Sequence, residues 1–244
     1  MKLKTLATVL LGGMLSFSTI AAEMTKTEVE KIVREYLVSN PEILIEMSNG
    51  LRAKQEMQQD ETDKALLKKH ADQLFRQKDD PATGNAKGTL TIVEFVDYNC
   101  GYCKRSAPLV QALLKKDQDI RYIYKEFPIL SDTSVYASKA ALAVNALFPE
   151  KYAAFHDALM SHSGAFKTND DIALVAKNLG LDWDKIAEKA KDPAIESKIA
   201  TNHALARTLN ITGTPAFIIG DQLLRGAPQT LEMLETSVKQ ARGK

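Results

Sequence analysis

The two cysteines of the chain, Cys100 and Cys103, are separated by two residues and lie between a predicted strand and a predicted helix. The strand is Thr89 to Val96, whose β-branched and aromatic residues are typical of a strand buried on both faces. After the cysteines, apolar residues recur at helical spacing from Leu109 to Leu114, and a second strand pattern runs from Ile120 to Phe127. Strand, helix and strand at this spacing predict a βαβ unit whose two strands are parallel.

The rest of this predicted domain consists of a long helical stretch and a short strand pair. Between Pro128 and Gly213 there are helical patterns but no strand pattern, and the stretch is far too long for a loop. The expected helices lie at about residues 134–147, 150–161, 169–179, 183–190 and 194–209, and the expected strands at 216–219 and 222–225. The turn signal Gly220–Asp221 joins these strands, and a closing helix follows them. The sequence therefore predicts an α/β domain over 79–244, with a helical subdomain inserted at about 131–210.

The first part of the chain after residue 22 is predicted to be helical. Apolar residues recur at helical spacing from Val29 to Leu37, and Asn40 followed by Pro41 is typical of a new helix start. The second helix can continue to about Lys78, because Gly50 is its only internal glycine or proline. We expect its polar stretch, 52–64, to be exposed on every face, as in a spacer.

These N-terminal helices need a partner for their apolar side chains. Residues 24–51 are too few to supply their own core. The simplest solution is a homodimer formed through residues 24–51, while an arrangement in which both helices fold back on the main domain stays open. We therefore assign 23–78 to an N-terminal helical dimerisation and stalk region. A turn-rich linker, 79–88, follows it and has room for a short edge strand.

The first 22 residues have the pattern of a secretory signal peptide. Lys2 and Lys4 precede an apolar run from Leu6 to Ile20, which ends at the small residues Ala21–Ala22. A transmembrane anchor needs about 20 apolar residues, and this run is shorter. We expect cleavage and export to an oxidising compartment, the periplasm, with association with the outer membrane left open. The formal charge of the whole chain is +1, which excludes the strongly basic character of a nucleic-acid-binding domain.

A Cys-x-x-Cys pair that follows a strand and begins a helix is typical of a thioredoxin-like redox site. The helix N-terminus offers unpaired N–H groups and a partial positive charge, which stabilise a thiolate at Cys100. Cys103, one turn deeper, can then resolve a mixed disulfide formed at Cys100. A purely structural disulfide is disfavoured, because a bridge across so short a loop removes little entropy from the unfolded chain.

Other uses of the two thiols fit the sequence less well. A zinc site normally takes four ligands, but there is no second cysteine pair, and the histidines are not closely spaced: His70, His156, His162 and His203. A c-type haem needs histidine where Lys104 stands. A Cys–His hydrolase would leave the second cysteine unexplained. Copper binding by the soft thiolates stays open.

The segment Gly213–Phe217, far along the chain, carries a second signal. Pro215 stands at the head of a strand, where proline is tolerated, so an ordinary strand start is one interpretation. Because the chain also has the cysteine pair, a more specific interpretation of Pro215 is favoured. A cis Thr214–Pro215 bond would hold the Thr214 backbone facing Cys100, where it can pair with a substrate strand.

Glu94 is a carboxylate in the middle of the apolar strand that leads to the cysteines. Alternation places Val96 on its face of the strand and Phe95 on the other. A buried acid with a raised pKa is a plausible proton acceptor for the deeper thiol, and Lys125 on the neighbouring strand is a candidate partner. The alternative is an edge position in which Glu94 faces water.

Taken together, CGYC after TLTIVEFVDYN, a helical insertion and then GTPAF resembles the bacterial periplasmic DsbA-type disulfide oxidoreductases over about residues 83–244. The resemblance implies a thioredoxin fold and places Glu94 where that family carries its buried glutamate. The N-terminal helices resemble the dimerisation regions of DsbC/DsbG-like and dimeric DsbA-like proteins. One departure is that monomeric DsbA has Pro-His between its cysteines, where this chain has Gly101–Tyr102. Losing the imidazole removes a positive neighbour from the Cys100 thiolate, so we expect a less extreme pKa.

The sequence thus predicts a periplasmic thiol:disulfide oxidoreductase that forms or isomerises disulfides in unfolded or misoxidised secreted proteins, reloaded by a membrane redox partner. We expect no metal or organic cofactor and no nucleic acid. The catalytic assignments are Cys100 for attack, Cys103 for resolution and Glu94 for proton transfer. The expected substrate-binding residues are Thr214, Pro215, Gly101 and Tyr102. The alternative is a copper-binding or holdase chaperone module with the same fold.

Overall fold

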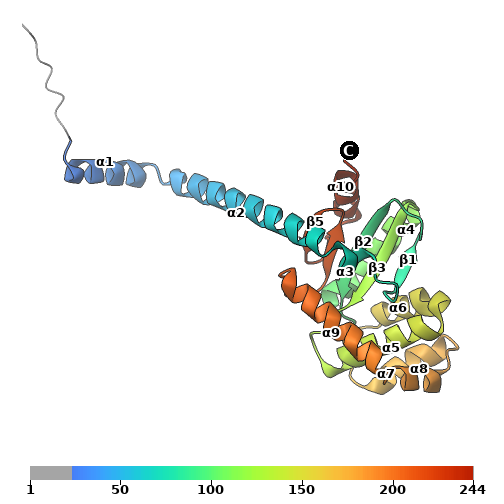
Figure 1. Cartoon of the computed structure of the whole chain (residues 1–244). Coiled ribbons are helices and arrows are strands. Elements are labelled where there is room, and N and C mark those ends of the chain that lie inside the picture. The colour runs from blue at the N-terminus through green and yellow to red at the C-terminus, as the bar shows by residue number, and fades with distance from the viewer. Residues whose placement is uncertain (1–23, 244) are drawn as a thin grey trace, which may run out of the picture. The chain divides into compact units, whose positions relative to one another are not determined.

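The structure is a computed structural model that describes residues 24–243 (Figure 1). The predicted signal peptide, residues 1–22, therefore lies outside the described residues. Contacts divide the chain into two compact units, the first ending at Lys54 and the second beginning at Gln55. Among the helices of residues 24–243, none combines the length and apolarity that crossing a membrane requires.

The first unit consists of α1 (Lys26–Ser39) and the beginning of α2 (Glu42–Lys69). A capping box starts α1: the Thr25 hydroxyl accepts a hydrogen bond from the Glu28 N–H, and the Glu28 carboxylate accepts one from the Thr25 N–H. No residue of α1 is buried. Large apolar side chains are exposed along both helices: Val29, Ile32, Val33, Tyr36, Val38, Leu44, Ile45, Met47 and Leu51. Local signals therefore form these helices without a core of their own.

The second unit is built on one five-stranded sheet with the order β1-β3-β2-β4-β5. Its strands are β1 (Ala82–Gly84), β2 (Leu90–Val96), β3 (Ile120–Glu126), β4 (Ala216–Ile219) and β5 (Gln222–Arg225). β2 and β3 are parallel, whereas the other neighbouring pairs are antiparallel. The predicted βαβ unit and the edge strand in the linker are both present.

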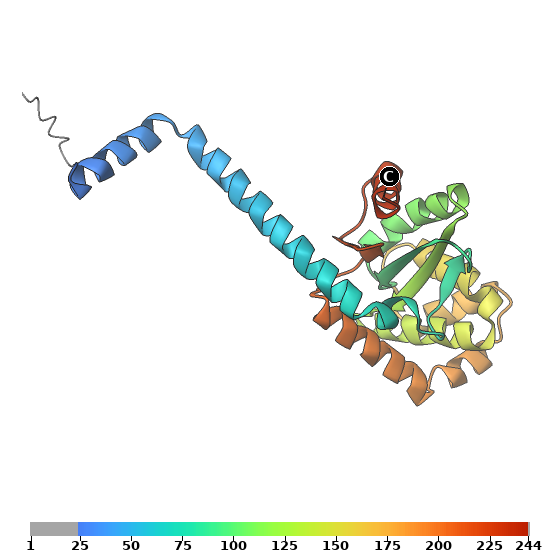
Figure 2. The same cartoon turned by 45° about the horizontal axis from the view of Figure 1, so that its top comes forward.

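Helices cover both faces of this sheet, and each face has its own core cluster. On one face, α4 (Gly101–Lys116) and α10 (Leu231–Ala241) pack on side chains that include Ile92 and Tyr122. On the other face, α3 (Ala71–Phe75) and α9 (Pro193–Thr208) pack on Val93 and Phe95. Figure 2 shows the sheet between α9 on one side and α4 with α10 on the other. Strand alternation divides the buried residues in this way.

The predicted helical insertion is present between β3 and β4. Its helices are α5 (Asp132–Leu147), the 3-10 turn η1 (Pro149–Lys151), α6 (Tyr152–Ser161), α7 (Asn169–Asn178), α8 (Trp183–Lys189) and α9. The side chains of Ser131, Thr168, Asp182 and Asp192 cap α5, α7, α8 and α9. Residues from α5 to α8 continue the core cluster on the Ile92 face, so the insertion extends the core next to the cysteine pair.

The second helix differs from its prediction in two ways. It ends at Lys69 rather than near Lys78, because the backbone turns at His70 and lets Leu74 of α3 pack beneath the sheet. Its polar stretch is not exposed throughout, since Asp63 is buried. The Asp63 carboxylate receives two hydrogen bonds from the Arg225 guanidinium, at 2.7 and 3.0 Å.

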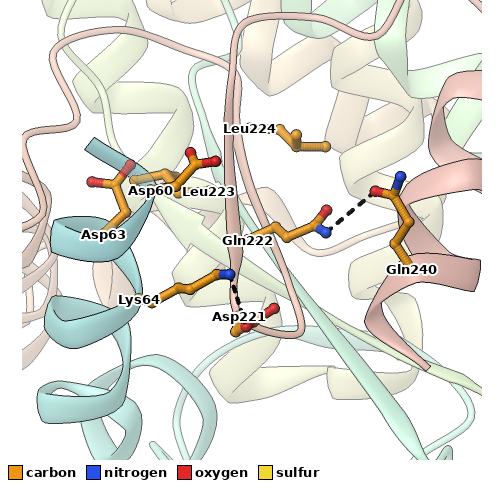
Figure 3. Close-up of a pocket in the computed structure, with 8 residues that line it drawn as sticks. All are labelled: Asp60, Asp63, Lys64, Asp221, Gln222, Leu223, Leu224 and Gln240. Atoms are coloured by element: carbon orange, nitrogen blue, oxygen red, sulfur yellow. Dashed lines mark hydrogen bonds and ion pairs between the residues drawn. The ribbon is translucent and has the colours of Figure 1, made fainter. Parts of the chain in front are cut away.

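The predicted boundary between the stalk and the main domain also moves. The second unit begins at Gln55, although the sequence placed the boundary after Lys78. Leu67 of α2 joins the core cluster of Leu74, and Lys64 pairs with Asp221 in the turn between β4 and β5 (Figure 3). These contacts make the last turns of α2 part of the second unit.

Candidate active site

Cys100 is the N-cap residue of α4, and Cys103 lies one turn further along the same helix. Both side chains are buried thiols, with Cys103 only 1% exposed. The Thr214–Pro215 bond is cis, as predicted, and the Thr214 carbonyl oxygen lies 3.2 Å from Cys100 Sγ, within hydrogen-bond distance when Cys100 is protonated. The structure therefore brings together two segments that are 114 positions apart.

The two thiols have opposite acidities. A hydrogen bond from the Cys103 side chain lowers the pKa of Cys100 to about 5, against the opposing effect of burial. The Thr214 side chain and the backbone N–H groups of Tyr102 and Cys103 lower it further. Burial raises the pKa of Cys103, and negative charge at Glu94 adds to this. At neutral pH, Cys100 is thus the thiolate and Cys103 the protonated thiol.

The loop before Cys100 is held by two polar side chains that sequence reasoning did not single out. The Asp97 carboxylate accepts hydrogen bonds from the N–H groups of Asn99, Ile129 and Leu130. The Asn99 amide donates to the hydroxyls of Ser131 and Thr133 and accepts from the Phe166 N–H. The segment that carries Cys100 is therefore fastened to the helical insertion. The available signal was a pair of Asx residues directly after a strand, which is typical of a structured turn.

Glu94 is buried, as predicted, with 4% of its surface exposed. Burial raises its pKa to about 8, even though a hydrogen bond from the Tyr122 hydroxyl, at 2.8 Å, lowers it. Negative charge at Cys100 and Glu126 raises this pKa further. Its electrostatic coupling to both cysteines connects Glu94 to the dithiol site.

The prediction that Lys125 is the partner of Glu94 is wrong. In the β2–β3 register Glu94 lies opposite Tyr124, whereas Lys125 lies opposite Phe95 and points to the other face of the sheet. There the Lys125 ammonium, 1% exposed, pairs with the buried Asp80 carboxylate, which also pairs with Lys198 at 2.6 Å. The true partner, Tyr122, follows from counting the alternation along β3.

Gly101 and Tyr102, between the cysteines, lie at the surface. Tyr102 is 59% exposed, and the Arg105 guanidinium lies 4.1 Å from the centre of its ring. A Cβ placed on Gly101 would have no neighbour within 4 Å. The two residues therefore leave the rim of the site open to a polypeptide.

Clustered metal ligands are absent from residues 24–243. Groups of three or more His, Cys, Asp or Glu side chains that could hold a metal ion do not occur in this part of the chain. The remaining donor set for a soft metal is the thiol pair itself, with two sulfur ligands.

Two family models match the chain. The model described as "DSBA-like thioredoxin domain" matches residues 91–239, which include all of β2 except its first residue, the helical insertion, and β3 to β5. The model described as "Copper resistance protein ScsC N-terminal domain" matches residues 26–58, which include α1 and more than half of α2.

Solved structures and curated sequences resemble the chain as well. The thiol-disulfide exchange protein alpha-DsbA2 from Wolbachia pipientis is 38% identical, with a TM-score of 0.69 over 74% of this chain and 96% of that one. A linker-deletion variant of ScsC from Proteus mirabilis is 32% identical, with a TM-score of 0.70 over 92% of this chain and 99% of that one. The Na(+)/H(+) antiporter NhaA 3 of Salinispora tropica is 30% identical over 163 residues, or 66% of this chain. The match spans only 24% of that relative's length.

Proposed function

Because the chain belongs to the DSBA-like thioredoxin domain family, we propose that it is a protein thiol:disulfide oxidoreductase that uses Cys100 and Cys103. The observation that carries this proposal is the pair of unequal thiols at the N-terminus of α4, next to the Thr214 carbonyl group. A thiolate that is stable at neutral pH is a good leaving group, so an oxidised Cys100–Cys103 pair readily accepts electrons from a substrate dithiol.

In disulfide formation, a substrate thiolate attacks the Cys100 sulfur of the oxidised pair. A bond forms between the substrate sulfur and Cys100, and Cys103 leaves as a thiolate that takes up one proton. A second substrate thiolate then attacks the mixed disulfide, so the substrate gains its disulfide and Cys100 leaves as the stabilised thiolate. The substrate loses two electrons, and the cysteine pair gains them.

In disulfide isomerisation, the reduced pair begins the cycle. The Cys100 thiolate attacks a wrong disulfide, and another thiolate of the same substrate displaces Cys100 with no net transfer of electrons. If this displacement stalls, Cys103 attacks Cys100 and releases the substrate in reduced form. That step needs a Cys103 thiolate, and Glu94, buried and with a pKa near 8, is the proposed acceptor of its proton.

Substrate binding is assigned to the backbone beside the thiols. The Thr214 carbonyl oxygen lies at hydrogen-bond distance from Cys100 Sγ, so an extended substrate segment that pairs with Thr214 and Pro215 has its cysteine at the reacting atom. The exposed Gly101 and Tyr102 form the other side of this approach. Unfolded or misoxidised polypeptides expose such extended segments.

Self-association through residues 24–51 is supported by the exposed apolar residues of α1 and α2 and by the ScsC N-terminal domain match. A homodimer is the commonest closed assembly, and it would give each substrate two catalytic sites at high effective concentration. The apolar leader, residues 1–22, and the likeness to a periplasmic thioredoxin-like protein from Salmonella enterica, 32% identical, support a periplasmic location. A membrane redox partner would then restore the active redox state.

The test uses the mature chain in its oxidised form, mixed with a reduced, unfolded protein that has two cysteines. We expect the substrate to lose both free thiols while the enzyme gains two, and the Cys100→Ser variant to leave the substrate reduced. The same protein in glutathione buffers gives the reduction potential, which decides between net oxidation and isomerisation. An unchanged substrate thiol count with the unsubstituted chain would contradict the proposal.

Copper handling is the second candidate, because the matched N-terminal family is described as belonging to a copper resistance protein. Two thiolates are soft ligands that suit Cu(I). The reduced protein, loaded with Cu(I) and passed through a desalting column, should retain stoichiometric copper if this candidate is right. The Cys100→Ser variant serves as the matched control.

A further inference from the structure

Glu126 is a second buried carboxyl on the sheet face that carries Glu94, and the reaction described above does not use it. It is the last residue of β3 and has no exposed surface. In the β2–β3 register it follows Tyr124, the residue opposite Glu94, by two positions, which places both acids on one face. The adjacent charges Lys125–Glu126 in an apolar strand were the sequence signal for a buried ionisable group on each face.

Three hydroxyl groups converge on the Glu126 carboxylate. Tyr98 and Tyr152 donate hydrogen bonds to Oε1, at 2.8 and 3.0 Å, and Ser138 donates to Oε2 at 2.7 Å. Tyr98 belongs to the loop that leads to Cys100, whereas Ser138 lies in α5 and Tyr152 at the start of α6. One buried side chain thus joins the catalytic loop to two helices of the insertion.

The three hydroxyl donors around the Glu126 carboxyl group fit its ionised form. An ionised carboxylate only accepts hydrogen bonds, so all three hydroxyls can donate to it. The Tyr98 oxygen also lies 3.0 Å from His156 Nδ1, and with its own proton directed at Glu126 it accepts from Nδ1–H. If Glu126 takes up a proton, its carboxyl group becomes a donor, and one of the three hydroxyls must accept from it instead of donating to it. When that hydroxyl belongs to Tyr98, the Tyr98 proton can turn toward His156 Nδ1. The network therefore changes direction when the Glu126 charge changes.

We propose that Glu126 is a positioning residue of the dithiol site: its carboxylate fixes the loop before Cys100 to the helical insertion, and its charge acts on Glu94. This inference rests on the proposed function, because it assigns to Glu94 the proton that leaves Cys103. Glu126 touches neither thiol in this arrangement. Its effect reaches them through Tyr98 on one side and through Glu94 on the other.

The surroundings of Glu126 bring the titration of its carboxyl group close to neutral pH. Burial raises its pKa to about 7, although the hydrogen bonds from Ser138, Tyr98 and Tyr152 lower it. The titratable or charged groups that face it, from the loop, the strands and α6, are Asp97, Tyr98, Glu94, Tyr124, Tyr152 and His156. Burial lowers the pKa of His156 to about 3, so this ring is neutral and leaves the Glu126 charge uncompensated. Negative charge at Glu126 accordingly raises the pKa of Glu94.

Two matched variants of the full mature chain separate the charge from the hydrogen bonds. Glu126→Gln keeps the shape of the side chain and removes its charge, while Tyr98→Phe keeps the carboxyl group and removes one of its three hydrogen-bond donors. Carbon-13 NMR of the glutamate carboxyl groups follows the Glu94 titration directly, with a Glu94→Gln sample for assignment. We expect Glu126→Gln to lower the pKa of Glu94 by roughly one unit, because a like charge has gone. The pH profile of mixed-disulfide resolution should move by the same amount.

Tyr98→Phe keeps the Glu126 carboxyl group and should shift the Glu94 titration less than Glu126→Gln does. Its main effect should be faster amide hydrogen exchange in the segment from Tyr98 to Cys100, because one hydrogen bond to Glu126 is lost. An unchanged Glu94 titration in Glu126→Gln, or an unchanged exchange rate in Tyr98→Phe, would overturn the proposal. The NMR titration requires no turnover. A chain that exchanges no disulfides would therefore contradict the proposed function. The NMR titration would still decide whether the charge of Glu126 acts on Glu94.

Discussion

The two units differ in which side chains they bury: the second buries even charged residues, whereas the first leaves apolar residues exposed. In the second unit even charged side chains are buried with partners, as Lys125 is with Asp80 and Glu126 is with Tyr98. In α1 no residue is buried, and apolar side chains such as Ile32 face solvent. The comparison teaches that the second unit buries its apolar residues in its own core, whereas the exposed apolar side chains of the first have the character of an interaction surface.

α2 belongs to both units and shows the same contrast within one helix. Its first turns carry Leu44, Met47 and Leu51 in exposed positions. Its last turns bury Leu67 and pair Asp63 with Arg225. A single helix therefore joins a segment whose apolar side chains are exposed to a segment that packs on the sheet, and changes in either half should have separable effects.

The largest effect is expected from the thiols of the second unit. Cys100→Ser should reduce disulfide exchange by roughly ten-thousandfold, because the nucleophile is lost. Cys103→Ser should still attack substrates and accumulate mixed disulfides, because only the resolving thiol is missing. Non-reducing gels of acid-quenched samples distinguish the two. Mixed disulfides that accumulate on Cys100→Ser instead would reverse the assigned roles.

Next in size is the loss of assembly when charge enters the apolar face of α1. The double variant Ile32→Glu with Val33→Glu should weaken self-association by roughly a thousandfold, since both copies bring unpaired charges to the interface. Analytical ultracentrifugation measures this, with Lys26→Gln on the same helix as the control. We expect substrate oxidation to persist and the repair of scrambled disulfides to be lost. A mature chain that sediments as a monomer at micromolar concentration would contradict the proposed interface.

A smaller effect is expected from Glu94, in the folding stability of the second unit. Its pKa is about 8 in the folded protein against 4.5 for the free group, so the folded state binds the extra proton between these values. Stability therefore falls as pH rises from about 4.5 through 8, and this penalty is absent below the lower value. Relative to Glu94→Gln, the unsubstituted chain should lose about 3 kcal/mol of unfolding free energy between pH 5 and pH 8. Urea unfolding at the two pH values measures this, and parallel pH dependence of both proteins would show that Glu94 is not shifted.

The smallest effect is expected where α2 meets β5. Asp63→Ala should lower the unfolding free energy by about 1 kcal/mol, because Arg225 is partly exposed and regains water when its partner is removed. Self-association should not change, since Asp63 belongs to the second unit. Glu56→Ala, an exposed acid two turns earlier on the same helix, is the matched control for urea unfolding. An equal loss in both variants would show that the ion pair contributes nothing specific.

Local patterns in the sequence predicted the residues of the site well, but they did not predict the long-range contacts that support it. Cys100, Cys103 and Pro215 follow from short motifs, and burial of Glu94 follows from its place in an apolar strand. The burial of Asp63 depends on Arg225, 162 positions later, and no periodicity along α2 reveals such a partner. The end of α2 at Lys69 was missed for the same reason, since packing of Leu74 beneath the sheet, rather than a glycine or proline, turns the chain there.

The burial of Cys103 also bears on how long the site survives in the presence of oxidants. A thiolate such as Cys100 is the form that peroxide converts to sulfenic acid, and further oxidation to sulfinic acid is irreversible. Cys103 sits one helical turn away, hydrogen-bonded to Cys100 and 1% exposed. It can condense with the sulfenic acid and release water, which produces the same disulfide that the catalytic cycle already contains. Chemical damage at the most reactive atom is thereby converted into an ordinary intermediate.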